Sequence, residues 1–263
     1  MLVFVHIEKT AGTSLKFILR NTFGKRHCDS LKNKKSIFTQ DDLDFAKKIF
    51  GKIKCITGHN IVEPTKYLTE ENIFFMTFLR DPLTRTASFY QDFCLRGKTE
   101  KISFEEWIKD ENKHNMQTKR IAGEEDVEKA KKILRDSYSF IGLTERFDDS
   151  LKLLSIISPE KLKFKYKKKL IAPSNAIKNE LIASPETNKI LQDTNKLDIE
   201  LYKYVKEELF PERLKEYQKE IDKVVLPNEY YKNHFTFNYQ ISVGFNKFVY
   251  RQLLKLRKAV FNK

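Results

Sequence analysis

The chain has 263 residues, 40% of them hydrophobic, so it is long enough to bury a sizeable core as one α/β domain with helical additions. Its 50 Lys and Arg residues outnumber 36 Asp and Glu residues. The formal net charge of +14 favours anionic partners such as nucleotides, acidic glycans, nucleic acid or anionic lipid. The three cysteines are too few and too dispersed for a disulfide framework or a zinc cluster, which indicates a reducing compartment.

The opening segment, Met1 to Ile7, is apolar but only one strand long, and the charged pair Glu8-Lys9 ends it. It has no basic leader, and no other stretch approaches the roughly 20 apolar residues that a membrane-spanning helix needs. We therefore expect no signal peptide, no membrane span and a cytoplasmic protein.

Three strands are predicted in the first third of the chain. Leu2 to Ile7 is short, β-branched and aromatic, and a helical pattern follows over Thr13 to Phe23, with Thr13 or Ser14 as its cap. Apolar runs at Ile53 to Thr57 and Ile73 to Leu79 predict two more strands, each followed by polar residues. Ligands bind at the carboxyl edge of parallel α/β sheets, so these polar residues indicate a ligand site there.

The remainder of the chain is predicted to be mainly helical. Pro82 suits the first turn of a helix, and Asp81 suits its cap. The predicted elements are a helix from Pro82 to about Leu95, a charged helical region from Phe104 to Arg135, a strand from Tyr138 to Leu143, a helix from about Asp148 to Ile157, a half-buried strand from Lys161 to Tyr166, and helices from Ser174 onward.

The turn after the first predicted strand has the composition of an anion site. Residues 8–14 read E-K-T-A-G-T-S and lead directly into a helix, so backbone N–H groups and the positive end of the helix dipole converge there. Lys9 adds a charge, and Thr10, Thr13 and Ser14 add hydroxyl donors. A Walker ATP loop has its lysine after the second glycine, whereas this lysine precedes the only glycine by three residues. An ordinary glycine-containing turn is the alternative.

A second candidate anion site follows the third predicted strand. The planar guanidinium of Arg80 suits a phosphate. Ser88 lies eight residues later, which returns it to nearly the same face of a helix at about 100° per residue. The alternatives are a salt bridge from Arg80 to Asp81 or Glu145 and a packing role for Ser88. Arg85 is interpreted as a surface or interhelix cation.

Among the five histidines, His59 follows a predicted strand in a Gly-His step at the ligand edge. A neutral imidazole there can take a proton from a hydroxyl, because its ordinary pKa lies close to neutral pH. A loop histidine bonded to the backbone is the alternative. His6 is interpreted as a core residue, and His114 is a weaker candidate for contact with an acceptor.

Residues 6–15, HIEKTAGTSL, and residues 78–90, FLRDPLTRTASFY, resemble the two nucleotide-binding motifs of the sulfotransferases that use 3′-phosphoadenosine 5′-phosphosulfate (PAPS). The resemblance is to the branch with the heparan sulfate 2-O-sulfotransferases and related carbohydrate enzymes, which often has proline in place of Glu8. Segments 115–118, 140–147 and 195–202 are similar to further family segments. The resemblance extends over approximately residues 1–210.

The resemblance implies an α/β, P-loop-like three-layer fold with a central parallel sheet flanked by helices and a helical C-terminal region. It implies in-line transfer of a sulfuryl group from PAPS to a hydroxyl of a carbohydrate, release of adenosine 3′,5′-bisphosphate, and no required metal. His59 corresponds to the general base, Glu63 is the runner-up base, and Lys9 stabilises the leaving oxygen. The implied donor ligands are Lys9, Thr10, Ala11, Gly12, Thr13, Ser14, Arg80 and Ser88.

The tail is strongly basic, with a net charge of +6 from Asn228 onward, and apolar residues recur at helical spacing from Phe245 to Val260. We expect a sulfotransferase domain over residues 1–227 and a basic helical extension over 228–263. The extension either docks on the domain or contacts an anionic membrane or acceptor. Lysines 165 and 167–169 either close over the nucleotide or form a solvated face.

Two other classes of function stay open. A P-loop nucleotide kinase or ATPase would need the Walker lysine, which is missing. A basic, non-catalytic protein that binds nucleic acid or lipid would leave the two strand-end motifs unexplained, so we expect no nucleic-acid partner.

Overall fold

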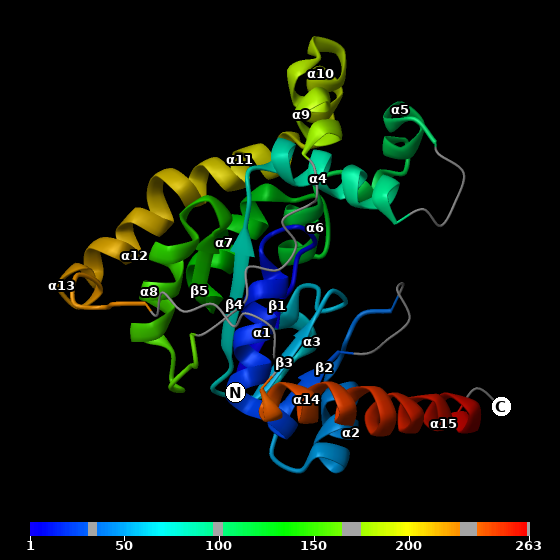
Figure 1. The fold of residues 1–263 in the computed structure, drawn as a ribbon, viewed down its shortest axis with the longest axis vertical. Coiled ribbons are helices and arrows are strands. Elements are labelled where there is room, and N and C mark those ends of the chain that lie inside the picture. Colours follow the sequence, from blue (N-terminus) through cyan, green and yellow to red (C-terminus); the bar gives the residue numbers. More distant parts are fainter. Residues whose placement is uncertain (31–35, 97–101, 165–174, 227–235, 262–263) are drawn as a thin grey trace.

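The computed structural model describes residues 1–30, 36–96, 102–164, 175–226 and 236–261 (Figure 1). At its centre is a five-stranded sheet with parallel pairings and the strand order β2-β3-β1-β4-β5. The strands are β1 (Leu2–Val5), β2 (His27–Asp29), β3 (Cys55–Gly58), β4 (Phe74–Leu79) and β5 (Tyr138–Leu143).

Helices connect and cover these strands. Those up to β5 are α1 (Gly12–Phe23), α2 (Gln40–Phe50), α3 (Pro64–Tyr67), α4 (Pro82–Leu95), α5 (Phe104–Ile108), α6 (Met116–Ala122) and α7 (Val127–Ser137). Those after β5 are α8 (Phe147–Ile157), α9 (Ala176–Ala183), α10 (Pro185–Thr194), α11 (Lys196–Tyr204), α12 (Phe210–Glu216), α13 (Gln218–Ile221), α14 (Phe237–Gly244) and α15 (Arg251–Phe261). Short 3₁₀ turns are η1 (Gly24–Arg26), η2 (Glu111–Lys113) and η3 (Thr144–Arg146), and π-helical turns are η4 (Val205–Leu209) and η5 (Phe245–Tyr250).

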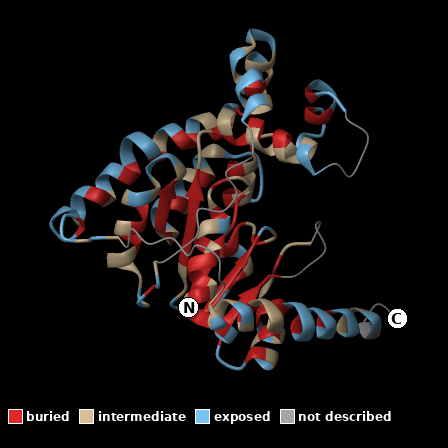
Figure 2. Ribbon diagram, viewed as in Figure 1, coloured by how far each residue is buried: buried red, intermediate tan, exposed pale blue. Residues whose placement is uncertain are grey.

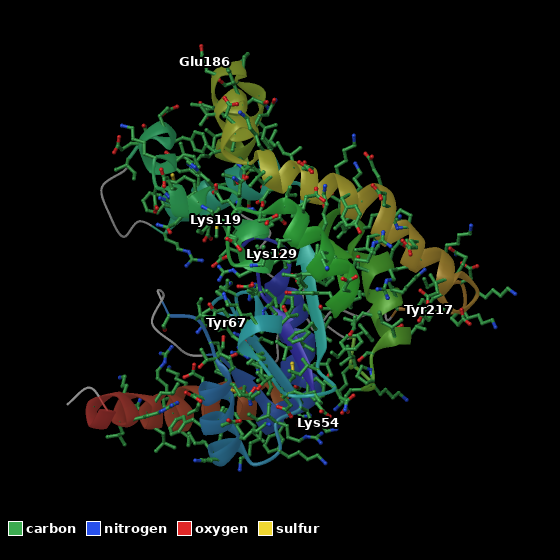
Figure 3. All side chains as sticks on the ribbon, turned by 180° about the vertical axis from the view of Figure 1, so that it is seen from behind. Lys54, Tyr67, Lys119, Lys129, Glu186 and Tyr217 are labelled. Carbon is green, nitrogen blue, oxygen red and sulfur yellow. The ribbon has the colours of Figure 1, made fainter. Side chains whose placement is uncertain are left out.

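The sheet is the middle of three layers. α1 and α8 lie on one face, where the backbone N–H of Lys163, just after α8, donates to Thr22 Oγ1 of α1 at 2.9 Å. α3 and α7 lie on the other face, where Lys129 Nζ is 2.8 Å from Glu63 Oε1 at the start of α3. Figure 3 shows this second face, with Tyr67 of α3 and Lys129 of α7 on it. The predicted α/β three-layer fold is confirmed.

β1 is the central strand, and all four of its residues are buried. Val5 pairs with Gly58 of β3 on one side and with Thr77 of β4 on the other. The carboxyl ends of these three strands therefore meet at one edge of the sheet. Coverage on both faces explains why β1 and β4 are nearly continuous apolar runs rather than alternating ones (Figure 2).

A helical lobe rises beyond that edge and has its own small core. α4, α5, α9 and α10 contribute its buried residues, among them Tyr90 and Trp107, whose ring centroids are 5.3 Å apart. The lobe includes Glu186 of α10, which Figure 3 labels at its tip. Because α4 follows β4 directly, this packing fixes the helix that carries Ser88 above the sheet edge.

The C-terminal helices run along the outer edge of the sheet, beside β2. α14 packs against α1, and the Phe50 ring at the end of α2 lies 5.0 Å from the Tyr250 ring of η5. Tyr250 and Leu254 are buried and belong to the main core. α15 extends past the rest of the molecule toward the C-terminus (Figure 1).

The sequence predictions and the structure differ at several elements, and α2 and α3 were not predicted. β2 was not predicted, because only one of its three residues is apolar. Residues 161–164 form no strand, and 165 and 166 lie outside the described residues. The cap of α1 is Ala11, without a side-chain hydrogen bond, rather than Thr13 or Ser14. By contrast, the predicted Asp81 cap of α4 is confirmed, since its side chain accepts from the Thr84 N–H at 2.8 Å.

Candidate active site

A cavity of about 810 Å³ opens at the carboxyl edge of β1, β3 and β4. It brings together side chains that are far apart in the sequence, from the first loop, from the ends of three strands and from α4. The sequence-predicted residues that line it are Lys9, Ala11, Gly12, Thr13, Ser14, His59, Arg80 and Ser88. One predicted ligand, Thr10, is not among the lining residues: it is fully buried, and its hydroxyl donates to the Ile7 carbonyl at 3.0 Å.

The loop between β1 and α1 has an unusual backbone. Lys9 and Ala11 adopt left-handed conformations, with φ of 68° and 58°. For residues other than glycine, such conformations cost about 1–2 kcal/mol each and are often retained at ligand sites. The one glycine serves a different purpose, because a Cβ on Gly12 would lie 2.0 Å from the His6 ring. The sharp turn leaves the first N–H groups of α1 without a side-chain cap, which is the arrangement of a helix N-terminal anion site.

Lys9 points its ammonium group across the mouth of this loop. Its Nζ lies 3.6 Å from Asp92 Oδ1 of α4, and both side chains are about a quarter exposed. A carboxylate at this distance is a weak ion pair, so an anion held by the loop can compete for the same ammonium group.

Arg80 follows β4 and lines the same cavity, and side-chain hydrogen bonds hold its backbone in place. The Gln117 carboxamide accepts from the Arg80 N–H and donates to the Arg80 carbonyl, both at 2.9 Å. The guanidinium Nη1 donates to the Lys9 carbonyl at 3.0 Å, so Arg80 directly contacts the anion loop. Its buried Nε finds no hydrogen-bond partner among the residues that the structure describes, and Glu145 Oε1 is 4.0 Å away. The predicted salt bridge from Arg80 to Glu145 is therefore marginal.

Gln117 is itself fixed from behind by α11. Both carboxylate oxygens of Asp198 accept N–H groups at the start of α6, from Gln117 at 3.0 Å and from Thr118 at 2.7 Å. Burial raises the pKa of Asp198, and the nearby Arg85 opposes that effect. Segments 115–118 and 195–202, which resemble family segments, thus form a chain of hydrogen bonds: Asp198 holds Gln117, and Gln117 holds the backbone of Arg80.

Arg85 is fully buried between α4 and α6 and does not line the cavity. Its guanidinium donates to Thr86 Oγ1 at 2.8 Å and contacts Met116 Sδ at 3.3 Å. The interpretation of Arg85 as a surface cation is therefore wrong, and the interhelix alternative describes its position.

His59 directly follows β3 and lines the cavity. About half of its side chain, 51%, is exposed. Its Nδ1 lies 2.7 Å from the His6 carbonyl, which can only accept, so Nδ1 carries the proton and Nε2 is left with a lone pair. Burial lowers the pKa of His59 below its usual value, although Glu8 and the His6 carbonyl raise it. The imidazole is therefore neutral at pH 7, as a general base must be.

The other candidates occupy different environments. His6 is buried, as predicted, but it also lines the cavity, and its ring lies 4.0 Å from that of His59. Glu63 does not line the cavity and pairs with Lys129. His114 does not line it either, and its Nε2 lies 2.7 Å from the Ile108 carbonyl.

Further polar side chains to which sequence reasoning assigned no role line the cavity, among them Lys16, Asp29, Ser30, Asn60 and Arg120. Lys16 Nζ lies 2.8 Å from Asp29 Oδ1, and Ser30 donates to the side-chain oxygen of Asn60. Asn60 Nδ2 is buried, and nothing in the described ranges accepts a hydrogen bond from it. The position of Asn60 next to His59 was the available signal for one of them, and Asp29 and Ser30 come from the end of β2 and the residue after it.

A parallel α/β sheet whose first loop leads into an uncapped helix N-terminus, with Lys9 in that loop and Arg80 at the next strand end, has a P-loop-like fold and the chemistry of an anion site. The comparison with protein families is more specific. The model of the sulfotransferase family matches residues 1–205, and the chain belongs to this family. The protein is therefore a transferase of sulfuryl groups. No curated protein matches the chain.

Proposed function

We propose that the protein transfers a sulfuryl group from PAPS to a hydroxyl of a carbohydrate, as the resemblance to the 2-O-sulfotransferase branch suggests. The observation that carries the proposal is the contact between Arg80 Nη1 and the Lys9 carbonyl inside one cavity. This contact joins the two anion sites, and PAPS is an anion at both its 3′-phosphate and its phosphosulfate end. The kinase alternative has no comparable support.

In the proposed reaction, Lys9 and residues 11–14 bind the phosphosulfate group, and Arg80 with Ser88 binds the 3′-phosphate. His59 Nε2 takes the proton of the acceptor hydroxyl, whose oxygen forms a bond to sulfur. The bond from sulfur to the bridging oxygen breaks, and Lys9 stabilises the charge on the departing adenosine 3′,5′-bisphosphate. No proton or electron is left over, because the proton stays on His59 until it passes to water.

The wall beyond His59 supports a carbohydrate acceptor. Ser30, Asn60 and Asp29 offer donors and acceptors, and the buried Asn60 Nδ2 lacks a partner within the part of the chain that the structure describes. Such a wall pairs with the hydroxyls of a sugar and would leave polar groups unsatisfied against an aromatic acceptor.

Peripheral membrane contact through the C-terminal helix is part of the proposal, and the surface of that helix supports it. Phe248 and Leu256 are 66% and 61% exposed, and residues 236–261 contain several Lys and Arg residues but no Asp or Glu. Sedimentation with anionic phosphatidylglycerol vesicles, compared with neutral phosphatidylcholine vesicles, tests it. Equal sedimentation with both would remove this part of the proposal. Within the described ranges, none of the helices combines the length and hydrophobicity needed to cross a membrane.

Calorimetric titration with adenosine 3′,5′-bisphosphate and with ATP tests the nucleotide. We expect the bisphosphate to bind more tightly, and preference for ATP would favour the kinase class. His59→Ala tests the base: turnover of ³⁵S-labelled PAPS should fall about 100-fold or more while affinity for the bisphosphate stays near normal. Retained turnover would remove His59 from this role.

A further inference from the structure

The carboxylate of Glu8 lies beside the imidazole of His59. Glu8 Oε1 is 3.4 Å from His59 Nδ1, the same nitrogen that contacts the His6 carbonyl at 2.7 Å. Both neighbours of Nδ1 are acceptors. They favour the tautomer in which Nδ1 is protonated, and they stabilise the imidazolium that forms when Nε2 gains a proton.

Arg120 of α6 fixes the position of Glu8. One guanidinium nitrogen, Nη2, lies 3.3 Å from Glu8 Oε1 and 3.2 Å from Oε2. Both side chains are largely buried, at 15% and 22% exposure, so the carboxylate cannot easily turn away from His59. Glu8 therefore faces the imidazole from one side and a cation from the other.

Glu8 also occupies the position at which the loop departs from the pattern that it resembles, where proline is frequent. A proline ring has no group that could accept a hydrogen bond from Nδ1 or balance the charge of an imidazolium. The carboxylate is thus a feature of this chain, and its contacts with His59 and Arg120 give it a specific task.

We propose that Glu8 is a positioning residue for the transfer reaction: held by Arg120, its carboxylate keeps the proton of His59 on Nδ1, aims Nε2 at the acceptor and stabilises the imidazolium. The inference rests on the proposed role of His59 as the base. It adds a Glu8–His59 pair, oriented by Arg120, to the donor and acceptor contacts already described.

The charges around His59 predict the sign of the effect. Glu8 raises the pKa of His59, and Arg120 of α6 and Lys16 of α1 lower it. The neighbouring His6 ring, tilted by 31° against that of His59, is neutral, because burial holds its pKa well below the usual value. Removing Glu8 should therefore lower the pKa of His59, and removing Arg120 should raise it. If Glu8 had only a structural role, the two substitutions would not shift the pKa of His59 in opposite directions.

The experiment compares Glu8→Gln, Arg120→Gln and wild type, each saturated with adenosine 3′,5′-bisphosphate. The His59 ring resonance, assigned by its loss in His59→Ala, is titrated by NMR. Its midpoint should move to lower pH in Glu8→Gln and to higher pH in Arg120→Gln. Glu71→Gln, at an exposed position, is the charge-matched control and should move nothing. An unchanged midpoint in Glu8→Gln overturns the proposal.

Kinetics give the second measurement. In Glu8→Gln, kcat should fall roughly 10- to 100-fold with little change in KM for PAPS, by analogy with the carboxylates that orient metal-bound histidines. The acidic limb of the kcat profile should move to lower pH, and Glu8→Asp should restore part of the rate. If His59→Ala stays active, the proposed base is wrong. If His59→Ala is inactive but Glu8→Gln keeps the wild-type rate and profile, only the role of Glu8 is wrong.

Discussion

On two sides of the cavity, at the ends of β4 and β2, a side-chain amide holds the backbone through two hydrogen bonds. The two amides come from different parts of the chain. On the β4 side, the Gln117 carboxamide bonds the N–H and carbonyl of Arg80. On the β2 side, the Asn246 carboxamide accepts from the Asp29 N–H at 2.7 Å and donates to the His27 carbonyl at 2.8 Å. In each case, a side-chain amide takes the place of a neighbouring strand.

The difference lies in where the two amides come from. Gln117 is inside the region that the sulfotransferase family model matches, whereas Asn246 is in η5, beyond residue 205. The β4 side carries Arg80, the proposed donor ligand, and the β2 side carries Asp29 and Ser30, on the proposed acceptor wall. We infer that donor binding depends on the family region and that the C-terminal helices shape the acceptor side.

The largest expected effect tests the β4 side. Arg80→Lys keeps the charge but removes the planar fork and the bond to the Lys9 carbonyl. Affinity for adenosine 3′,5′-bisphosphate should fall about 10- to 100-fold, since a charged hydrogen bond contributes roughly 1.5–3 kcal/mol. Affinity for adenosine 5′-monophosphate, which has no 3′-phosphate, should change little. Calorimetry measures both.

The matched control is Arg96→Lys, because Arg96 lines the same cavity but is 70% exposed and pairs with Asp92 at 2.7 Å. We expect no loss of affinity for either nucleotide. An equal loss for the two nucleotides in Arg80→Lys would mean that Arg80 does not bind the 3′-phosphate.

The next effect compares the two amides directly. Gln117→Leu and Asn246→Leu each leave buried backbone groups without partners, which should lower the free energy of unfolding by about 1–3 kcal/mol in both variants. Only Gln117→Leu should also weaken binding of adenosine 3′,5′-bisphosphate, several-fold, because only Gln117 holds Arg80. Urea denaturation and calorimetry provide the two measurements. An equal loss of nucleotide affinity in Asn246→Leu would contradict the inference that the β4 side binds the donor and the β2 side the acceptor.

The β4 side was also the side that could be predicted from the sequence. β4 is a continuous apolar run, and Asp81-Pro82 gives a clear helix start, so the bounds of α4 were predicted correctly. The positions of Lys9, Arg80 and Ser88 on one cavity followed from the rule that ligands bind at strand ends. Local sequence was sufficient there because each element carries its own signal.

The β2 side could not be predicted, because its order comes from distant contacts. β2 is three residues long, and its partner Asn246 is 217 residues from Asp29 in the chain. The left-handed backbone conformations of Lys9 and Ala11 could not be predicted from the sequence either, since neither residue is a glycine. Such features depend on tertiary hydrogen bonds and packing, which override local propensity.

The smallest effect is a pH dependence on the β2 side. His27 is fully buried, with Nε2 3.2 Å from Thr57 Oγ1 and Nδ1 3.2 Å from Ser242 Oγ of α14. Burial lowers the pKa of His27 to about 3, although Asp29 raises it. An unfolded histidine titrates near 6.5, so between these two values the unfolded state binds more protons than the folded state. Stability should therefore fall as the pH drops from about 6.5 toward 3, by roughly 1 kcal/mol per pH unit.

Comparison of His27→Gln with the wild type isolates this contribution. The pKa values of His6 and His59 are also lowered by burial, and both residues remain in the two proteins, so their share cancels in the difference. The variant should be less stable at pH 7, because glutamine fills the site less well, yet its free energy of unfolding should fall less steeply between pH 6.5 and 4. Urea denaturation over this range measures both curves. Parallel curves would show that His27 does not stay neutral in the folded protein, and that the junction of β2 with the C-terminal helices is more open to water than its burial indicates.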